Sequence, residues 1–235
     1  MIMSPIPEKL QAVRAAIAQA AQEAGRDSSE VQLLAVSKTF GAPDVLQAVQ
    51  AGQIAFGENY LQEAIDKMAE MRILAPNIML EWHFIGPIQS NKTRPIAGHF
   101  AWVHTVERVK IAQRLSEQRP LGLPDLNICL QVNISGEASK GGVSPEELPE
   151  LAKLVASLPR LKLRGLMAIP EPENDPLAQR LPFRRMRELF DSLRAGGIAL
   201  DTLSMGMSSD MNAAILEGAT MVRVGSAIFG HRNYG

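Results

Sequence analysis

The segment "LNICLQV", residues 126–132, is apolar on both of its faces and decides the fold class. A half-buried strand alternates apolar and polar residues, whereas a strand buried on both faces reads as an almost continuous apolar run. Such strands belong to parallel sheets that helices cover on both sides. Short apolar runs recur in both directions along the chain, and the predicted strands are 31–36, 54–57, 81–85, 101–104, 126–133, 161–168, 201–204 and 220–224.

Helical patterns alternate with these runs. In "SPEELPELAKLVASL", Ser144 is predicted as the N-cap, Pro145 as the first helical residue and Glu147 as the capping-box acid. The stretch 170–182, rich in proline and acidic residues, is interpreted as a long loop. Further helices are predicted at 5–24, 180–194 and 209–217.

Eight β/α units in one domain predict a (β/α)₈ TIM barrel, an α/β fold, with an additional N-terminal helix. A doubly wound open sheet is the alternative. No linker or low-complexity tract divides the chain, so residues 1–235 are predicted to form a single domain.

Bulk composition narrows the function classes. The chain has 235 residues and a formal net charge of −1, which gives no basic surface for nucleic acid. The one cysteine, Cys129, lies in an apolar strand and is interpreted as a small core residue. With no disulfide framework, signal peptide or apolar run of membrane-spanning length, a cytoplasmic protein is expected.

Polar residues follow several predicted strands at the point where each ends. Lys38 comes after the first strand, Asn59 after the second, and Ser204 ends the seventh. Because TIM-barrel active sites lie at the carboxyl ends of the strands, these side chains are expected around one opening. Lys38 is either a solvated loop residue or an amine placed for chemistry, and its own segment leaves both open.

Small residues follow the last two strands. Ser208 and Ser209 in "MGMSSDM" cap a helix or bind an anion with free N–H groups and hydroxyls. Gly225 and Ser226 in "VGSAIFG" repeat the arrangement, and loops in this place often bind phosphate in TIM barrels.

Arg223 lies within the eighth strand and needs an acceptor there, either a structural carboxylate or a ligand atom. A lysine, a phosphate site and an arginine around one opening fit pyridoxal 5′-phosphate (PLP). Its aldehyde needs an amine, its phosphate needs donors and its pyridine nitrogen needs a partner.

The chain resembles the pyridoxal phosphate homeostasis proteins and is similar to the N-terminal fold type III barrel of alanine racemase. The resemblance rests on "LLAVSKTF", "FGENYLQEA", "WHFIGPIQSNK", "VNISGEASKGGV", "GLMAI", "LSMGMSSDM" and "VRVGSAIFG". It implies that Lys38 holds PLP as a Schiff base and that Arg223 faces the pyridine nitrogen. The implied phosphate ligands are Ser208, Ser209, Gly225 and Ser226, and the implied ring-lining residues are Asn59, Met167, Ser204 and Gly206.

His83 and Asn91 match the third-strand motif of this family without an assigned role, and His83 is expected to be a packed, hydrogen-bonded residue. The resemblance implies a PLP-binding protein of vitamin B6 homeostasis and amino-acid balance without robust catalysis. An arginine at the pyridine nitrogen disfavours its protonation and weakens the ring as an electron sink. Racemisation also needs a second acid or base, and neither Tyr60 nor Tyr234 is an obvious one.

Two other functions remain open, a PLP-dependent amino-acid racemase and a cofactor-free Schiff-base aldolase. No metal site is predicted. The expected state is a monomer, and the sequence does not identify a protein that receives PLP.

Overall fold

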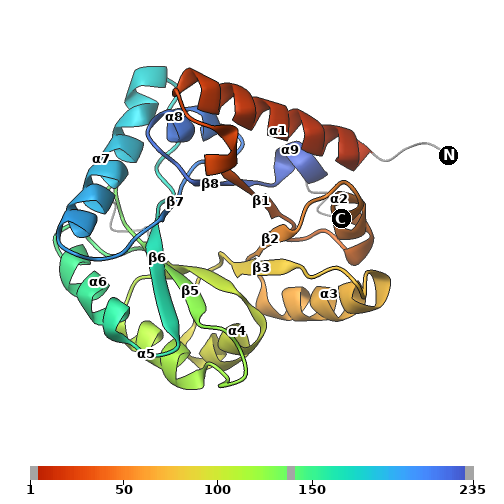
Figure 1. Cartoon of the computed structure of the whole chain (residues 1–235), viewed down its shortest axis with the longest axis horizontal. Helices are drawn as coiled ribbons and strands as arrows, with labels where there is room; N and C mark the ends of the chain where they lie inside the picture. Colours follow the sequence, from red (N-terminus) through yellow and green to blue (C-terminus); the bar gives the residue numbers. More distant parts are fainter. Residues whose placement is uncertain (1–4, 137–140, 231–235) are drawn as a thin grey trace.

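Eight parallel strands close into a barrel, with each strand paired to the next and β8 paired to β1. We describe a computed structural model that covers residues 5–136 and 141–230. Figure 1 shows the strands as a ring inside the helices. The strands are β1 (Gln32–Val36), β2 (Ala55–Glu58), β3 (Glu81–Phe84), β4 (Trp102–Val106), β5 (Leu126–Gln131), β6 (Leu161–Met167), β7 (Thr202–Ser204) and β8 (Met221–Val224).

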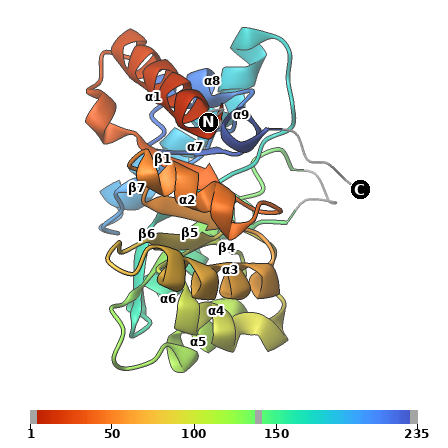
Figure 2. The ribbon, with the colours of Figure 1, turned by 90° about the vertical axis from the view of Figure 1, so that its right-hand side faces the viewer.

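Helices follow the strands and form the outer layer (Figure 2). Their bounds are α1 (Pro5–Glu23), α2 (Ala42–Gln50), α3 (Leu61–Leu74), α4 (Thr93–His99), α5 (Val109–Gln118), α6 (Leu148–Ser157), α7 (Pro176–Ala195), α8 (Met211–Leu216) and α9 (Ser226–Phe229), with short 3₁₀ turns at Ser28–Glu30 and Ser90–Lys92. The predicted extra helix is α1, which packs against α2, α8 and α9.

The closed sheet confirms the predicted TIM barrel and excludes the open sheet. Pairing of Leu33 with Val222 and of Ala35 with Val224 joins the first strand to the last. Every predicted strand is present, and its limits differ from those observed by at most two residues.

The predicted starts of two helices are wrong. The helix expected at Pro145 begins at Leu148, and 145–147 form a turn. Ser144 Oγ does accept the N–H of Glu147 at 3.2 Å, but the Glu147 carboxylate accepts the Ser144 hydroxyl instead of completing the capping box.

The stretch 170–182 is not loop throughout, because α7 begins at Pro176 and contains Pro182. The Asp175 carboxylate caps this helix by accepting from the N–H groups of Leu177 and Ala178.

Most of the apolar core lies between the barrel and its helices. Inside the barrel there are two small clusters, Leu34 with Ala55 and Met221, and Trp102 with Cys129 and Met167. Cys129 is fully buried, as predicted, and burial raises the pKa of its thiol to about 12. Among the described residues, no helix combines the length and the apolar character that a membrane crossing requires.

Candidate functional site

A cavity of about 600 Å³ opens at the carboxyl ends of the barrel strands. Eight of the ten predicted site residues line it: Lys38, Asn59, Met167, Ser208, Ser209, Arg223, Gly225 and Ser226. The other two, Ser204 and Gly206, are buried behind the lining. The strand ends have therefore brought together residues from five separate parts of the chain.

Lys38 lies in the loop that follows β1 and is half-buried at the cavity. The residues on either side of it are held by side chains of β2 and α3. Ser37 Oγ donates to Glu58 Oε1 at 2.6 Å, and the Thr39 N–H donates to Glu63 Oε1 at 2.6 Å. Thr39 has a φ of 69°, which is costly for a β-branched residue. The loop that carries Lys38 is thus held in place from both sides.

The anchor of this loop is a buried ion pair between Glu58 and Lys67. Lys67 Nζ lies 2.6 Å from Glu58 Oε1, and it also donates to the carbonyl of Ser37 at 2.8 Å. The Glu58 side chain is fully buried and that of Lys67 is 3% exposed. Burial raises the pKa of the Glu58 carboxyl, while Lys67 opposes that rise. Buried ion pairs often add little net stability, and the observed effect of this one is to hold Ser37 through its side chain and its carbonyl.

The predicted phosphate residues meet at one side of the cavity. Ser208 and Ser209 lie in the turn before α8, and Ser226 is the first residue of α9. The hydroxyls of Ser226 and Ser208 are 3.4 Å apart. Within the described part of the chain, the backbone N–H groups of all three serines lack a protein acceptor. Several donors therefore converge without an acceptor, which suits an anion.

Two glycines leave room that a side chain would fill. A Cβ on Gly225 would lie 3.1 Å from the Val36 carbonyl oxygen, so the backbone passes close to β1 at the edge of the cavity. Gly206 has a φ of +94°, and a Cβ there would lie 2.6 Å from Ala214 Cβ. Gly206 thus serves the tight turn behind the site.

Arg223 extends from β8 into the base of the cavity and is 4% exposed. Its Nη1 donates to the carbonyl of Ser204 at 2.6 Å and to Ser204 Oγ at 2.9 Å, and its Nη2 donates to the carbonyl of Ala168 at 2.9 Å. Burial lowers the pKa of Arg223 to about 10, still high enough to keep the charge at neutral pH. Among the described residues, no carboxylate pairs with it directly.

A sequence model of the alanine racemase N-terminal domain matches residues 9–233. The pyridoxal phosphate homeostasis protein of Pseudomonas aeruginosa is 63% identical over 233 residues, which cover 99% of this chain and 98% of that protein. The protein of the same name from Escherichia coli K12 is 53% identical over 232 residues, or 99% of each chain. This chain belongs to the pyridoxal phosphate homeostasis protein family.

Solved structures agree with this membership. PipY of Synechococcus elongatus, solved without PLP, is 37% identical with a TM-score of 0.84, covering 96% of this chain and all of that chain. The same protein with PLP bound is 36% identical with a TM-score of 0.82, again covering 96% of this chain and 100% of PipY. Alanine racemase of Corynebacterium glutamicum shares only the fold, with 18% identity and a TM-score of 0.64 over 96% of this chain and 62% of the racemase.

Sequence reasoning missed two residues that shape the site, Phe40 and Lys67. Phe40 lines the cavity and stacks on Phe229 with ring centroids 5.1 Å apart. Phe40 is only two residues after Lys38 in the "SKTF" segment, so the sequence could have predicted an aromatic side chain in the wall of the cavity. Lys67 gave no signal, because a lysine on a helix is usually exposed.

The third-strand motif lies apart from the cavity. His83 is fully buried inside the barrel with both ring nitrogens hydrogen-bonded, as the sequence predicted. Asn91 is exposed in the turn Ser90–Lys92 and does not line the cavity.

Proposed function

We propose that this protein binds PLP in the cavity as a Schiff base on Lys38 and acts in vitamin B6 homeostasis without robust catalysis. The observation that carries the proposal is the convergence of Lys38, Arg223 and the three serines on one cavity. PipY, a relative 36% identical, has been solved with PLP bound. The relatives named above as pyridoxal phosphate homeostasis proteins span nearly the whole chain.

The residues fit the chemical groups of PLP. The neutral amine of Lys38 would add to the aldehyde carbon, and water would leave as the C=N bond forms. Ser208, Ser209 and Ser226 would donate to the phosphate, with Gly225 allowing the backbone to approach. Arg223 would face the pyridine nitrogen, while Asn59 and Met167 would lie against the ring. When bound, PLP supplies an electron-accepting ring.

The set of ionisable groups supports a binding role rather than a racemase. Of the described residues that line the cavity, Lys38 and Arg223 are the two with ionisable side chains. Racemisation needs an acid or base on each face of the substrate carbon, and Arg223 stays charged. Tyr60 is 51% exposed and does not line the cavity, and Tyr234 falls outside the described residues.

The first experiment is an absorbance spectrum of the purified protein with PLP, before and after borohydride reduction, followed by mass mapping of the adduct. We expect an imine band that borohydride traps on Lys38. Lys38→Ala should lose this band and retain weaker, phosphate-anchored binding, since the donors for phosphate remain. Lys153→Ala, an exposed lysine of α6, is the matched control.

An imine band that persists in Lys38→Ala would remove Lys38 from the proposal. A protein that shows no band at all with PLP would support the cofactor-free aldolase instead. Turnover of L- or D-alanine at a rate typical of enzymes, about 1–10³ s⁻¹, would overturn the non-catalytic part and favour the racemase.

A further inference from the structure

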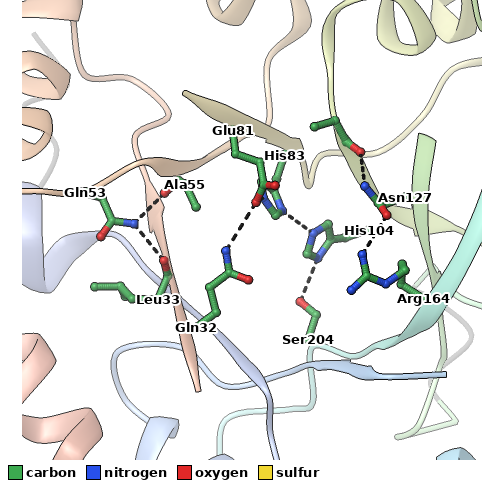
Figure 3. Close-up of polar contacts among 11 residues, drawn as sticks. Gln32, Leu33, Gln53, Ala55, Glu81, His83, His104, Asn127, Arg164 and Ser204 are labelled. Carbon is green, nitrogen blue, oxygen red and sulfur yellow. Dashed lines mark hydrogen bonds and ion pairs between the residues drawn. The ribbon is translucent and has the colours of Figure 1, made fainter. Parts of the chain in front are cut away.

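A chain of polar side chains crosses the interior of the barrel and ends at Arg223. Figure 3 shows Glu81 hydrogen-bonded to His83, His83 to His104, and His104 to Ser204. The distances are 2.8 Å from Glu81 Oε1 to His83 Nε2, 2.9 Å from His83 Nδ1 to His104 Nε2, and 2.8 Å from His104 Nδ1 to Ser204 Oγ. Arg223 Nη1 then reaches the same Ser204 Oγ at 2.9 Å.

The two ends of this chain fix the direction of every hydrogen bond in it. An ionised carboxylate only accepts and a guanidinium only donates. His83 Nε2 must therefore carry a hydrogen, which leaves its Nδ1 as an acceptor for His104 Nε2–H. His104 Nδ1 in turn accepts the hydroxyl hydrogen of Ser204, whose oxygen accepts from Arg223. All four hydrogen bonds between the five side chains therefore have a donor and an acceptor, and they follow one consistent order.

Burial supports this order, because it keeps both imidazoles neutral. His83, His104 and Ser204 are fully buried. Burial lowers the pKa of His83 and lowers that of His104 well below its ordinary value. The hydrogen bond from His83 lowers the pKa of Glu81, so that the carboxylate stays ionised.

Glu81 lies at the amino end of β3, whereas the cavity lies at the carboxyl ends of the strands. Its side chain is 40% exposed and does not line the cavity. We propose that Glu81 is a positioning residue that acts through His83, His104 and Ser204 to hold the guanidinium of Arg223 in place for the ligand. This inference rests on the proposed function for the identity of that ligand, PLP.

The need for an acceptor at Glu81 becomes clear when the directions of these hydrogen bonds are reversed. Without an acceptor next to His83, both rings can turn to their other tautomer, and His104 Nδ1–H would then donate to Ser204 Oγ. The buried Ser204 hydroxyl hydrogen would be left beside two other donors, His104 and Arg223. A buried donor without an acceptor is costly, so Arg223 or Ser204 would have to move.

The decisive variant is Glu81→Leu, because it removes the acceptor without touching the cavity. Glu81→Gln is the conservative rescue, since its amide oxygen can still accept from His83. Glu30→Leu is the matched control. Glu30 is an exposed acid in the turn before β1, and its partner, Arg26, does not belong to the series of hydrogen-bonded side chains from Glu81 to Arg223.

The first readout needs no ligand. Two-bond ¹⁵N–¹H spectra of the histidine rings in the PLP-free protein report each tautomer. We expect Nε2–H for His83 and His104 in the unaltered protein, in Glu81→Gln and in the control. We expect a change at His104 in Glu81→Leu. An unchanged His104 in a folded Glu81→Leu protein overturns the inference, whatever the protein does with PLP.

The second readout is PLP binding followed by absorbance. Glu81→Leu should bind PLP about three- to tenfold more weakly, the range expected when one hydrogen bond is impaired, and should shift the pH midpoint of the imine band. Glu81→Gln should restore most of both. If the His104 tautomer changed while the PLP affinity and the imine spectrum did not, the proposal that Glu81 positions Arg223 would also be overturned. Absence of an imine band in the unaltered protein would instead count against the proposed function. The histidine tautomers would then decide whether Glu81 sets the direction of the hydrogen bonds that lead to Arg223.

Discussion

At the scale of single residues, the serines carry the clearest consequence. Ser208 and Ser209 lie in the turn before α8 and Ser226 begins α9, and their hydroxyls and free N–H groups converge at the cavity. Hydrogen bonds to a charged group contribute about 1.5–3 kcal/mol each, more than neutral ones. The hydroxyls should therefore account for a measurable part of PLP affinity.

Changing Ser208 and Ser209 together to Ala should weaken PLP binding about 10²- to 10⁴-fold, because two donors to the phosphate are lost while the backbone N–H groups remain. The measurement is a titration of the imine band, with pyridoxal, which has no phosphate, as a second ligand. The variant should bind pyridoxal as the unaltered protein does. Ser28→Ala with Ser29→Ala, in the turn before β1, is the control. Unchanged PLP affinity would exclude both serines from the site.

Some residues of the site could be predicted from the sequence and others could not. Lys38, Arg223 and the serines were predicted to meet because each follows a strand of a barrel or lies near the end of one. Ser204 was grouped with them for the same reason, yet its hydroxyl lies behind Arg223. Nothing in "WVHTV" distinguishes His104 as the partner of His83, because that contact depends on strand pairing and not on spacing along the chain.

At the scale of elements, β2 and α3 together hold the loop that carries Lys38. The Glu58 carboxylate accepts from Ser37 and Lys67, and its Oε2 is buried without a hydrogen-bond partner among the described residues. This carboxylate therefore depends on Lys67 for its charge. Removing one partner of a buried ion pair costs about 3–5 kcal/mol, because the other charge remains in the interior.

Lys67→Met should lower the free energy of unfolding by about 3–5 kcal/mol at pH 8. Burial raises the pKa of Glu58, and loss of Lys67 raises it further. The folded variant then binds a proton more tightly than the unfolded chain, so its stability falls as pH rises toward that pKa. The deficit relative to the unaltered protein should accordingly shrink as the pH is lowered. Urea unfolding between pH 5 and pH 8 measures this.

The double variant Glu58→Gln with Lys67→Met separates charge from packing. It should recover much of the lost stability and lose the additional pH dependence. A Lys67→Met deficit that stays constant with pH would mean that packing, rather than the charge of Glu58, sets the cost.

The elements themselves were largely predictable. Strands buried on both faces leave a run of apolar residues that can be recognised in one sequence, as in β5. The start of α7 was misplaced because proline and acids were interpreted as loop. Asp175 followed by Pro176 is in fact a helix-start signal, an N-cap before a proline at the first helical position. The buried pair of Glu58 and Lys67 was not predictable, because it depends on which face α3 turns toward the barrel.

At the scale of the whole molecule, the barrel does not need a ligand to complete its core. The apolar cluster between strands and helices is continuous around the structure, and the cavity lies at one end of the barrel. The PLP-free protein should therefore fold. That the chain is one domain and a monomer stays a prediction, for which gel filtration with light scattering is the test.

Removal of PLP should leave near-ultraviolet circular dichroism and cooperative unfolding intact. Added PLP at about 100 times its dissociation constant should stabilise the fold by about 2.7 kcal/mol. For a chain of this size that corresponds to a rise in Tm of roughly 5–10 °C. The check is differential scanning fluorimetry with and without PLP. A PLP-free protein that lacks a cooperative transition would show that the ligand is part of the core.

The hydrogen-bonded side chains from Glu81 to Arg223 also place opposite charges toward the two ends of the barrel. The negative charge is the Glu81 carboxylate at the amino end of the barrel, and the positive charge is the guanidinium beside the cavity. A net charge of −1 conceals this separation. Salt screens the buried guanidinium weakly, whereas the 40% exposed Glu81 carboxylate is screened by ions in the solvent. A phosphate anion that enters the cavity is consequently attracted by the charge of Arg223 before any hydrogen bond to the serines forms.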